Sequence, residues 1–220
     1  EAALYAHQII TAELKAKYPD IPQLSEEAKE IPYEERKHWG EFFLIDPLDG
    51  TKEFIKKNGE FTVNIAFIRQ GKPVAGVVHA PVLETTYYAD QAQGAKLERA
   101  GEVVDLPFQS FDSQNLRVVA SKSHLNEETQ VFVDQLKENY PTVEFKSMGS
   151  SLKLCLVATG EADIYPRLGP TCEWDTAAAQ AVVEASGGEV LVYDEWTPLE
   201  YNKPEVLNPY FVVRRKEVEL

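Results

Sequence analysis

The sequence has little cysteine, few basic side chains and no long hydrophobic run. Only Cys155 and Cys172 occur, without a Cys-x-x-Cys pair, which argues against a disulfide framework or a thiolate zinc site and favours a reducing cytoplasm. The 22 Lys and Arg residues face 36 Asp and Glu residues, a net charge of −14. This balance argues against polymeric nucleic acid and against an anionic membrane surface as partners. No apolar run approaches the roughly 18–20 residues of a transmembrane segment.

The rest of the composition is typical of a globular chain. The 220 residues are 44% hydrophobic and 26% charged, which allows a sizeable core and fits one generous domain or two small lobes. The chain begins at Glu1 within a helical pattern and without a start methionine. We therefore expect an upstream segment of the protein to be missing from this sequence.

Periodicity and turn residues predict a mixture of helices and strands. Helices are expected at 2–18, 127–139, 151–159 and 176–186. Strands are expected at 42–45, 61–68, 74–79, 85–89, 116–120 and 211–214. Strands dominate before residue 120 and alternate with helices after it. The pattern therefore indicates an α/β protein with two lobes, 1–110 and 111–220.

The most informative stretch is 46–51, Asp-Pro-Leu-Asp-Gly-Thr, which follows an apolar run typical of a buried strand. The end of that strand would place Asp46 and Asp49 together at an edge of the sheet. Pro47 stiffens the loop, and Gly50 allows another backbone to approach closely. Clustered carboxylates of this kind are ligands for a hard cation such as Mg²⁺. Because Asp-Gly is also a strong hairpin signal, a plain turn is the alternative.

Two further acids stand out. Glu26 lies in a polar stretch without helical periodicity, where adjacent acids are commonly just solvated surface. Asp175 precedes the small residues 176–179, which look like the start of a helix. An ordinary N-cap explains Asp175 on helix signals alone. A helix N-terminus also attracts phosphate, so a structural and a functional role both stay open.

Taken in order, these motifs resemble the inositol monophosphatase superfamily. The resemblance rests on Ser-Glu-Glu at 25–27, Asp-Pro-Leu-Asp-Gly-Thr-Lys-Glu-Phe-Ile at 46–55 and Trp-Asp-Thr-Ala-Ala-Ala at 174–179. The stretches 58–66 (Asn-Gly-Glu-Phe-Thr-Val-Asn-Ile-Ala) and 149–153 (Gly-Ser-Ser-Leu-Lys) are similar to those of the bacterial 3′(2′),5′-bisphosphate nucleotidases. The resemblance covers essentially the whole chain. It implies an α/β layered sandwich of alternating helix and sheet layers.

The resemblance further implies a lithium-sensitive phosphatase that uses two or three Mg²⁺ ions. Its metal ligands would be the carboxylates of Glu26, Asp46, Asp49 and Asp175 and the carbonyl oxygen of Leu48. Glu26, Asp49 and Thr51 would be catalytic, with Thr51 positioning the nucleophilic water. The backbone N–H groups of Gly50 and Thr51 would face the phosphate. Several converging carboxylates repel one another unless cations neutralise them, which fits at least two Mg²⁺.

The implied substrate is a small nucleotide bisphosphate, adenosine 3′,5′-bisphosphate, with 3′-phosphoadenylyl sulfate as a second candidate. Besides residues 48–51 and Asp175, the second lobe would supply contacts from Ser121, His124, Gly149, Lys153 and Arg167. Lys153 and Arg167 would meet the non-scissile phosphate, and an Arg can bind it with two parallel bonds. On residue type alone, His124 reads as a helix-entry residue and Lys153 as a solvated cation.

One position departs from the family pattern. The family carries an aspartate 23 residues before the metal-binding glutamate, where it bonds the threonine that Thr51 matches. Counting back from Glu26 reaches Ala3. A slow enzyme, an altered chain and a catalytically silent nucleotide-binding relative therefore all stay open. An inositol monophosphatase and a sugar bisphosphatase are the alternatives among enzymes, and a monomer or homodimer is expected.

Overall fold

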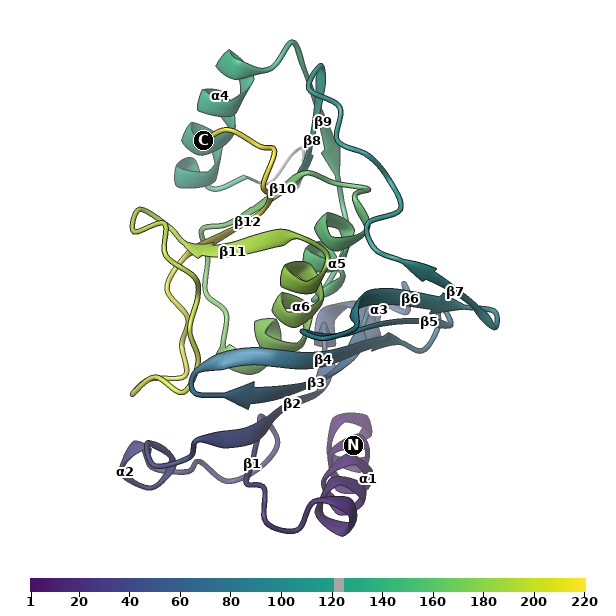
Figure 1. The fold of residues 1–220 in the computed structure, drawn as a ribbon, viewed down its shortest axis with the longest axis vertical. Coiled ribbons are helices and arrows are strands. Elements are labelled where there is room, and N and C mark those ends of the chain that lie inside the picture. The colour runs from purple at the N-terminus through teal and green to yellow at the C-terminus, as the bar shows by residue number, and fades with distance from the viewer. Residues whose placement is uncertain (121–124) are drawn as a thin grey trace.

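The computed structural model describes residues 1–120 and 125–220. Two sheets alternate with layers of helices (Figure 1). Helix α1 (Ala2–Lys17) lies on the outer side of the first sheet, and α4 (Glu127–Asn139) lies at the other end, beside the second sheet. Helices α5 (Leu152–Thr159) and α6 (Glu173–Ala185) lie between the two sheets. The α/β layered sandwich expected from the sequence is confirmed.

The first sheet contains seven strands in sequential order. They are β1 (Gln23–Ser25), β2 (Glu41–Asp49), β3 (Thr62–Arg69), β4 (Lys72–Ala80), β5 (Thr85–Asp90), β6 (Gly94–Arg99) and β7 (Glu102–Asp105). β1 is parallel to β2, and each later pair is antiparallel. Two short helices, α2 (Tyr33–Arg36) and α3 (Thr51–Lys56), flank β2 along the chain. The parallel pairing brings the chain after β1 to the end of β2 that carries the acidic motif.

The second sheet has the order β11-β12-β10-β8-β9. Its strands are β8 (Asn115–Val119), β9 (Thr142–Lys146), β10 (Ile164–Arg167), β11 (Gly188–Val192) and β12 (Phe211–Arg215). Helix α4 packs Phe132 and Val133 with Leu116 and Ile164 of this sheet in a separate apolar cluster. Because α4 has an apolar stripe and an exposed polar face, one side covers the sheet while the other meets water.

Helix α6 packs very closely on the first sheet. It contacts β2 to β6 on one side and β11 on the other. A Cβ atom on Gly76 of β4 would lie only 2.5 Å from the carbonyl oxygen of Ala178 and 2.9 Å from its Cα. The alanines at 177–179 are fully buried at this contact. Small residues on both sides therefore fix the height of α6 above the sheet, and with it the position of its first turn.

The helices and strands expected from the sequence are present, with shifted bounds. β2 does not end near Asp46 but continues to Asp49, and α6 begins at Glu173, three residues earlier than expected. The strands β1, β6, β7, β9, β10 and β11 and the short helices α2 and α3 were not expected. β7, for example, is exposed at every position and so lacks a buried face to detect. The larger apolar cluster draws on both sheets, and the division at about residue 110 stays a prediction. In the described ranges no helix has the length and apolar character needed to cross a bilayer.

Candidate active site

A β-bulge brings Asp46 and Asp49 to one side of β2. Residues three apart in a regular strand point to opposite faces. Here Asp46 pairs with Asn64 and Asp49 with Thr62, so three steps on β2 oppose two steps on β3. Because the bulge adds one residue to β2, Asp46 and Asp49 point to the same face of the sheet instead of opposite faces. The Leu48 N–H donates to Asp46 Oδ1 at 3.1 Å and helps to hold this bend.

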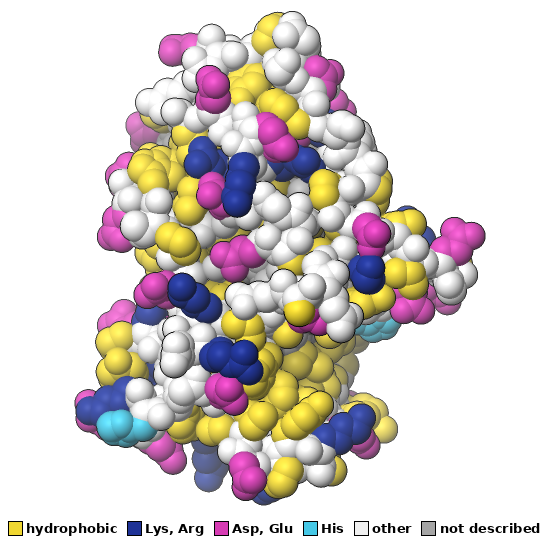
Figure 2. All heavy atoms as spheres, viewed as in Figure 1, with side chains coloured by type: hydrophobic (Ala, Val, Ile, Leu, Met, Phe, Trp, Pro, Cys, Tyr) yellow, Lys and Arg dark blue, Asp and Glu magenta, His cyan; other side chains and the backbone are white. Residues whose placement is uncertain are grey.

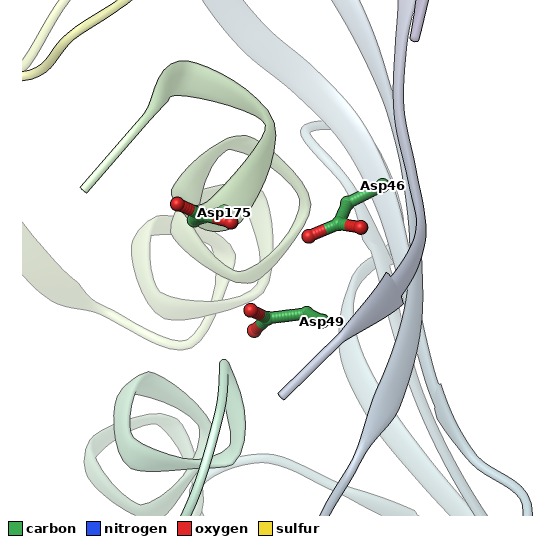
Figure 3. Close-up of side chains that lie close together, drawn as sticks. All are labelled: Asp46, Asp49 and Asp175. Atoms are coloured by element: carbon green, nitrogen blue, oxygen red, sulfur yellow. The ribbon is translucent and has the colours of Figure 1, made fainter. Parts of the chain in front are cut away.

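The two β2 carboxylates meet a third one from α6. One oxygen from each of Asp46, Asp49 and Asp175 lies within 4.8 Å of the others, and the side chains converge from strand and helix (Figure 3). Asp175 is the third residue of α6, and its Oδ2 accepts the Cys172 N–H at 2.8 Å. The N-cap interpretation of Asp175 was therefore wrong in position, because Cys172 is the N-cap. The capping bond leaves Asp175 free to direct an oxygen at the cluster.

Glu26 lies beside this group. Its N–H donates to the carbonyl oxygen of Ile45 at 3.2 Å, which extends the parallel pairing of β1 with β2 by one bond. Partial burial raises the pKa of the Glu26 carboxyl, and the negative charges of Asp175 and Glu27 raise it further. The carboxyl of Glu26 is therefore close enough to Asp175 for electrostatic repulsion, although it is not part of the tight three-carboxylate group.

The cluster is electrostatically strained in the absence of a cation. Burial raises the pKa of Asp46 to about 11, aided by the charges of Asp49, Glu26 and Asp175. Burial and the charge of Asp175 raise the pKa of Asp49 to about 7, against the lowering effect of a 2.7 Å bond from the Ser151 N–H. Asp46 Oδ2 is buried and has no hydrogen-bond partner among the described residues. Converging carboxylates with an unpartnered buried oxygen fit a bound metal ion.

The metal-free protein should lose stability as the pH rises from about 4 through about 7. The folded pKa of Asp49, about 7, lies above the ordinary aspartate value of 3.8, so folding favours the protonated carboxyl. That contribution is complete below the unfolded pKa and is lost as the pH passes the folded one. Thermal melts with chelator at pH 5 and pH 8 measure it. Asp49→Asn should reduce the change in melting temperature between the two pH values. An equal change in the variant and the wild type would contradict the raised pKa of Asp49.

The Asp-Gly pair forms the start of a helix rather than a hairpin, so the plain-turn alternative is wrong. Gly50 has φ +89° and is the N-cap of α3, whose first residue is Thr51. A Cβ atom on Gly50 would lie 2.9 Å from Ser150 Cβ, and one on Gly149 would lie 2.5 Å from Glu53 Cγ. Residues 149–151 therefore cross directly over the start of α3. Glycine is needed here for close approach and, at Gly50, also for the backbone angle.

Two hollows adjoin each other, and the smaller one reaches the cluster. The smaller, about 110 Å³, is lined by Asp49 and Asp175, among others. The larger, about 270 Å³, includes Lys146 at the end of β9. Both are lined by Lys153, Tyr165 and Arg167. We call the smaller one, with Asp49 and Asp175, the acidic hollow and the larger one, with Lys146, the cationic hollow. The two are joined through the side chains that line both.

The two shared cations are held close together in a protein of net charge −14. Burial lowers the pKa of Lys153, and the Arg167 guanidinium lowers it further. Lys153 Nζ lies 5.9 Å from the centre of the Tyr165 ring. Arg167 Nη2 donates to the Pro170 carbonyl oxygen at 3.2 Å, while its buried Nε has no partner in the described ranges. Adjacent, partly unpaired cations at the end of a cleft suit an anionic ligand.

The structure places most of the predicted site residues at or beside this region. Ser121 and His124 lie outside the described residues, and Ala3 is a partly exposed residue of α1. Sequence analysis missed the role of Ser151, whose backbone N–H bonds Asp49, although its glycine- and serine-rich surroundings hinted at a close approach. It also missed Lys146, because a single lysine at the end of a weakly alternating strand carries no distinctive signal.

Known proteins share this architecture and sequence. The model of the inositol monophosphatase family matches residues 1–216. The 3′(2′),5′-bisphosphate nucleotidase CysQ of Salmonella typhimurium is 50% identical over 213 residues, covering 96% of this chain and 83% of that protein. CysQ of Escherichia coli K12 is 48% identical over 216 residues, with coverages of 96% and 83%. The crystal structure of CysQ from Bacteroides thetaiotaomicron, a bacterial member of the inositol monophosphatase family, matches with a TM-score of 0.90 and 42% identity, over 98% of this chain and 84% of that one. Motifs, fold and relatives agree, and the chain belongs to the inositol monophosphatase family.

Proposed function

We propose that the protein is a 3′(2′),5′-bisphosphate nucleotidase that converts adenosine 3′,5′-bisphosphate to AMP and phosphate. The observation that carries this proposal is the junction of the acidic hollow with the cationic hollow at Lys153 and Arg167. A substrate with two phosphates needs both environments, one for the phosphate that is cleaved and one for the phosphate that stays. The names of the CysQ relatives support the same activity.

The acidic hollow would hold Mg²⁺. Its ligands would be the Glu26, Asp46, Asp49 and Asp175 carboxylates with the Leu48 carbonyl, enough for two or three ions. Bound Mg²⁺ would polarise the scissile phosphate, lower the pKa of a water molecule and stabilise the leaving oxygen.

The protein's own groups would then orient the reaction. The backbone N–H groups of Gly50 and Thr51, at the start of α3, would bind phosphate oxygens. The Thr51 hydroxyl would position the attacking water. The Ser151 N–H holds Asp49 in place at 2.7 Å. Catalysis here would depend mainly on positioning and on the charge of the site.

The cationic hollow would hold the rest of the nucleotide. Lys153 and Arg167 would bind the non-scissile phosphate, with Lys146 as a third cation at the rim. Apolar lining from Met148 and Leu168 in the same hollow suits the flat face of a nucleoside. Ser121, His124 and Gly149 stay predicted contacts on this side. The same contacts would accept 3′-phosphoadenylyl sulfate.

A substrate panel tests the proposal. Phosphate release is measured with adenosine 3′,5′-bisphosphate, 3′-phosphoadenylyl sulfate, inositol 1-phosphate and fructose 1,6-bisphosphate, each with and without Mg²⁺. We expect the highest kcat/KM for the nucleotide and no release without the metal. A higher kcat/KM for the inositol or sugar phosphate would overturn the substrate assignment. Calorimetric binding of the nucleotide without turnover would instead identify a binding-only relative.

Lys153→Ala should raise KM for adenosine 3′,5′-bisphosphate far more than for a small phosphate monoester. Losing a charge-assisted hydrogen bond to phosphate costs about 1.5–3 kcal/mol, which corresponds to a roughly 10- to 100-fold weaker affinity for the nucleotide. Lys137→Ala, at an exposed position of α4, is the matched control. Equal effects of Lys153→Ala on both substrates would show that Lys153 serves the metal side or only the fold.

The cell compartment and the assembly state are parts of the same proposal. Cys155 and Cys172 are both free thiols, which supports a reducing cytoplasm. A monomer or a homodimer is expected, and light scattering at micromolar concentration distinguishes them.

A further inference from the structure

A buried polar network lies outside the carboxylate cluster and starts two residues before Asp175. Glu173, in the first turn of α6, is fully buried. Its Oε1 accepts the Asn202 N–H at 2.8 Å, and its Oε2 accepts the Lys203 N–H at 3.1 Å and Lys203 Nζ at 2.7 Å. Both oxygens are thus bonded to the loop between β11 and β12. Glu173 therefore fastens that loop to α6 instead of facing the cluster as a further ligand.

The same loop is bonded to Arg36 of α2, which lies ten residues after Glu26. Arg36 is 3% exposed, and its Nη1 donates to Asn202 Oδ1 at 2.9 Å and to the Lys203 carbonyl oxygen at 2.7 Å. Its Nη2 donates to the Pro204 carbonyl oxygen at 2.9 Å, and Asn202 Nδ2 donates back to the Arg36 carbonyl oxygen at 2.8 Å. Figure 1 shows this yellow loop reaching toward α2. Asn202 thus links α2 to α6.

Another residue of the loop, Asn208, holds the turn in front of Asp175. Asn208 Nδ2 donates to the Cys172 carbonyl oxygen at 3.0 Å and to Thr176 Oγ1 at 3.0 Å. Cys172 is the residue whose N–H bonds Asp175 Oδ2. The Cys172 backbone before Asp175 and the Thr176 side chain after it are therefore both bonded to the β11–β12 loop.

The segments joined in this way are those that the sheet alone does not hold. Asp46 and Asp49 lie on β2, which is paired on one side with β1 and on the other with β3. Glu26 follows a strand of only three residues, and Asp175 lies at the end of a helix. Carboxylates that converge without a cation repel one another. The backbones that carry Glu26 and Asp175 are therefore the ones that need an external restraint.

We propose that Arg36, Asn202 and Glu173 are positioning residues that hold the Glu26 segment and the first turn of α6 at the separation a bound cation requires. The inference rests on the proposed metal site and concerns side chains that do not themselves form the cluster. It predicts that loosening this network weakens the binding of Mg²⁺ to the free protein. Because a bound ion pulls the ligands together, saturating Mg²⁺ restores the geometry.

The variant Asn202→Gly tests this role. Asn202 has φ +64°, so glycine adopts its conformation without strain, keeps the backbone bond to Glu173 and deletes both side-chain bonds to Arg36. Ala100→Gly is the control, because Ala100 has φ +52° in the β6–β7 turn. Titration calorimetry of nucleotide-free protein measures the Kd for Mg²⁺. We expect Asn202→Gly to raise Kd at least about fivefold and Ala100→Gly less than twofold, with kcat at saturating Mg²⁺ within about twofold of the wild-type value.

The outcomes separate this inference from the proposed function. Equal Kd values for Asn202→Gly and the wild type overturn the positioning role while leaving the metal site intact. A loss of kcat at saturating Mg²⁺ with unchanged Kd also overturns it. A wild-type protein that binds no Mg²⁺ removes the metal site and the positioning role together. If circular dichroism shows that Asn202→Gly is unfolded, Arg36→Lys is the deciding variant. It keeps the positive charge but loses the two Nη atoms that bond three acceptors in the loop. It should also raise the Kd for Mg²⁺.

Discussion

Asp46→Asn is expected to lower Mg²⁺ affinity more than about 100-fold and to abolish Mg²⁺-dependent phosphate release. Mutating a group that only supports a metal ligand lowers metal affinity about 10- to 100-fold, so removing a ligand itself should lower it more. Asp46 contributes a buried oxygen that has no other partner among the described residues. Calorimetry gives the Mg²⁺ affinity, and a phosphate assay gives the turnover.

The same substitution should leave the fold intact and should not destabilise the metal-free protein at pH 8. With a pKa of about 11, the Asp46 carboxyl is protonated there, and a neutral amide of the same shape replaces it closely. Asp134→Asn, on the exposed side of α4, is the control for an Asp-to-Asn change away from the cluster. Unchanged Mg²⁺ affinity in Asp46→Asn would exclude Asp46 as a metal ligand.

Ala3→Asp is expected to raise turnover at least tenfold. The attacking water must lose a proton as it reacts, and the Thr51 hydroxyl can accept its hydrogen bond only if its own hydrogen is directed elsewhere. A carboxylate at position 3 would accept that hydrogen and receive charge as the proton leaves. Positioned acid–base groups contribute about 10²- to 10⁴-fold in rate. Alanine offers no acceptor, so the present chain should be a slow enzyme.

Single-turnover phosphate release at saturating nucleotide and Mg²⁺ measures this gain. Ala2→Asp is the matched control, since it places the same charge on the exposed neighbouring position of α1. Nucleotide affinity should change little in both variants, because metal and phosphate binding do not involve this group. If Ala3→Asp is no faster than the wild type, the water is activated without that acid, or position 3 is not the matching position.

The acids of the proposed metal site could be picked out from the sequence because each one lies in a short motif. Their arrangement could not. The same residues are compatible with a strand that ends at Asp46 and with a strand that bulges after Asp46 and continues to Asp49. Only the register of the pairing with β3 distinguishes the two. A proline inside a strand is the one local signal for such a bulge. Asp175 was likewise identified as an acid at a helix start, but its place in the third position depends on which residue caps the helix.

The polar network around Arg36 could not be predicted at all. Asn202 and Lys203 lie more than 160 residues from Arg36 along the chain, and neither belongs to a motif. A lone arginine in a four-residue helix reads as surface, whereas here five hydrogen bonds from or to Arg36 keep it buried. Long-range polar contacts between irregular segments leave no periodicity for sequence analysis to detect.

The contact between Gly76 and α6 has a consequence for sequence variation. A side chain at position 76 would collide with the backbone of Ala178, not with its side chain. A smaller residue at position 178 therefore cannot compensate, and any substitution at 76 has to tilt or lift the whole helix that carries Asp175. Across related sequences we expect position 76 to be invariant, with no compensating partner that varies together with it. In a random mutagenesis screen for activity, Gly76 should behave like a site residue although it belongs neither to the carboxylate cluster nor to the lining of the two hollows.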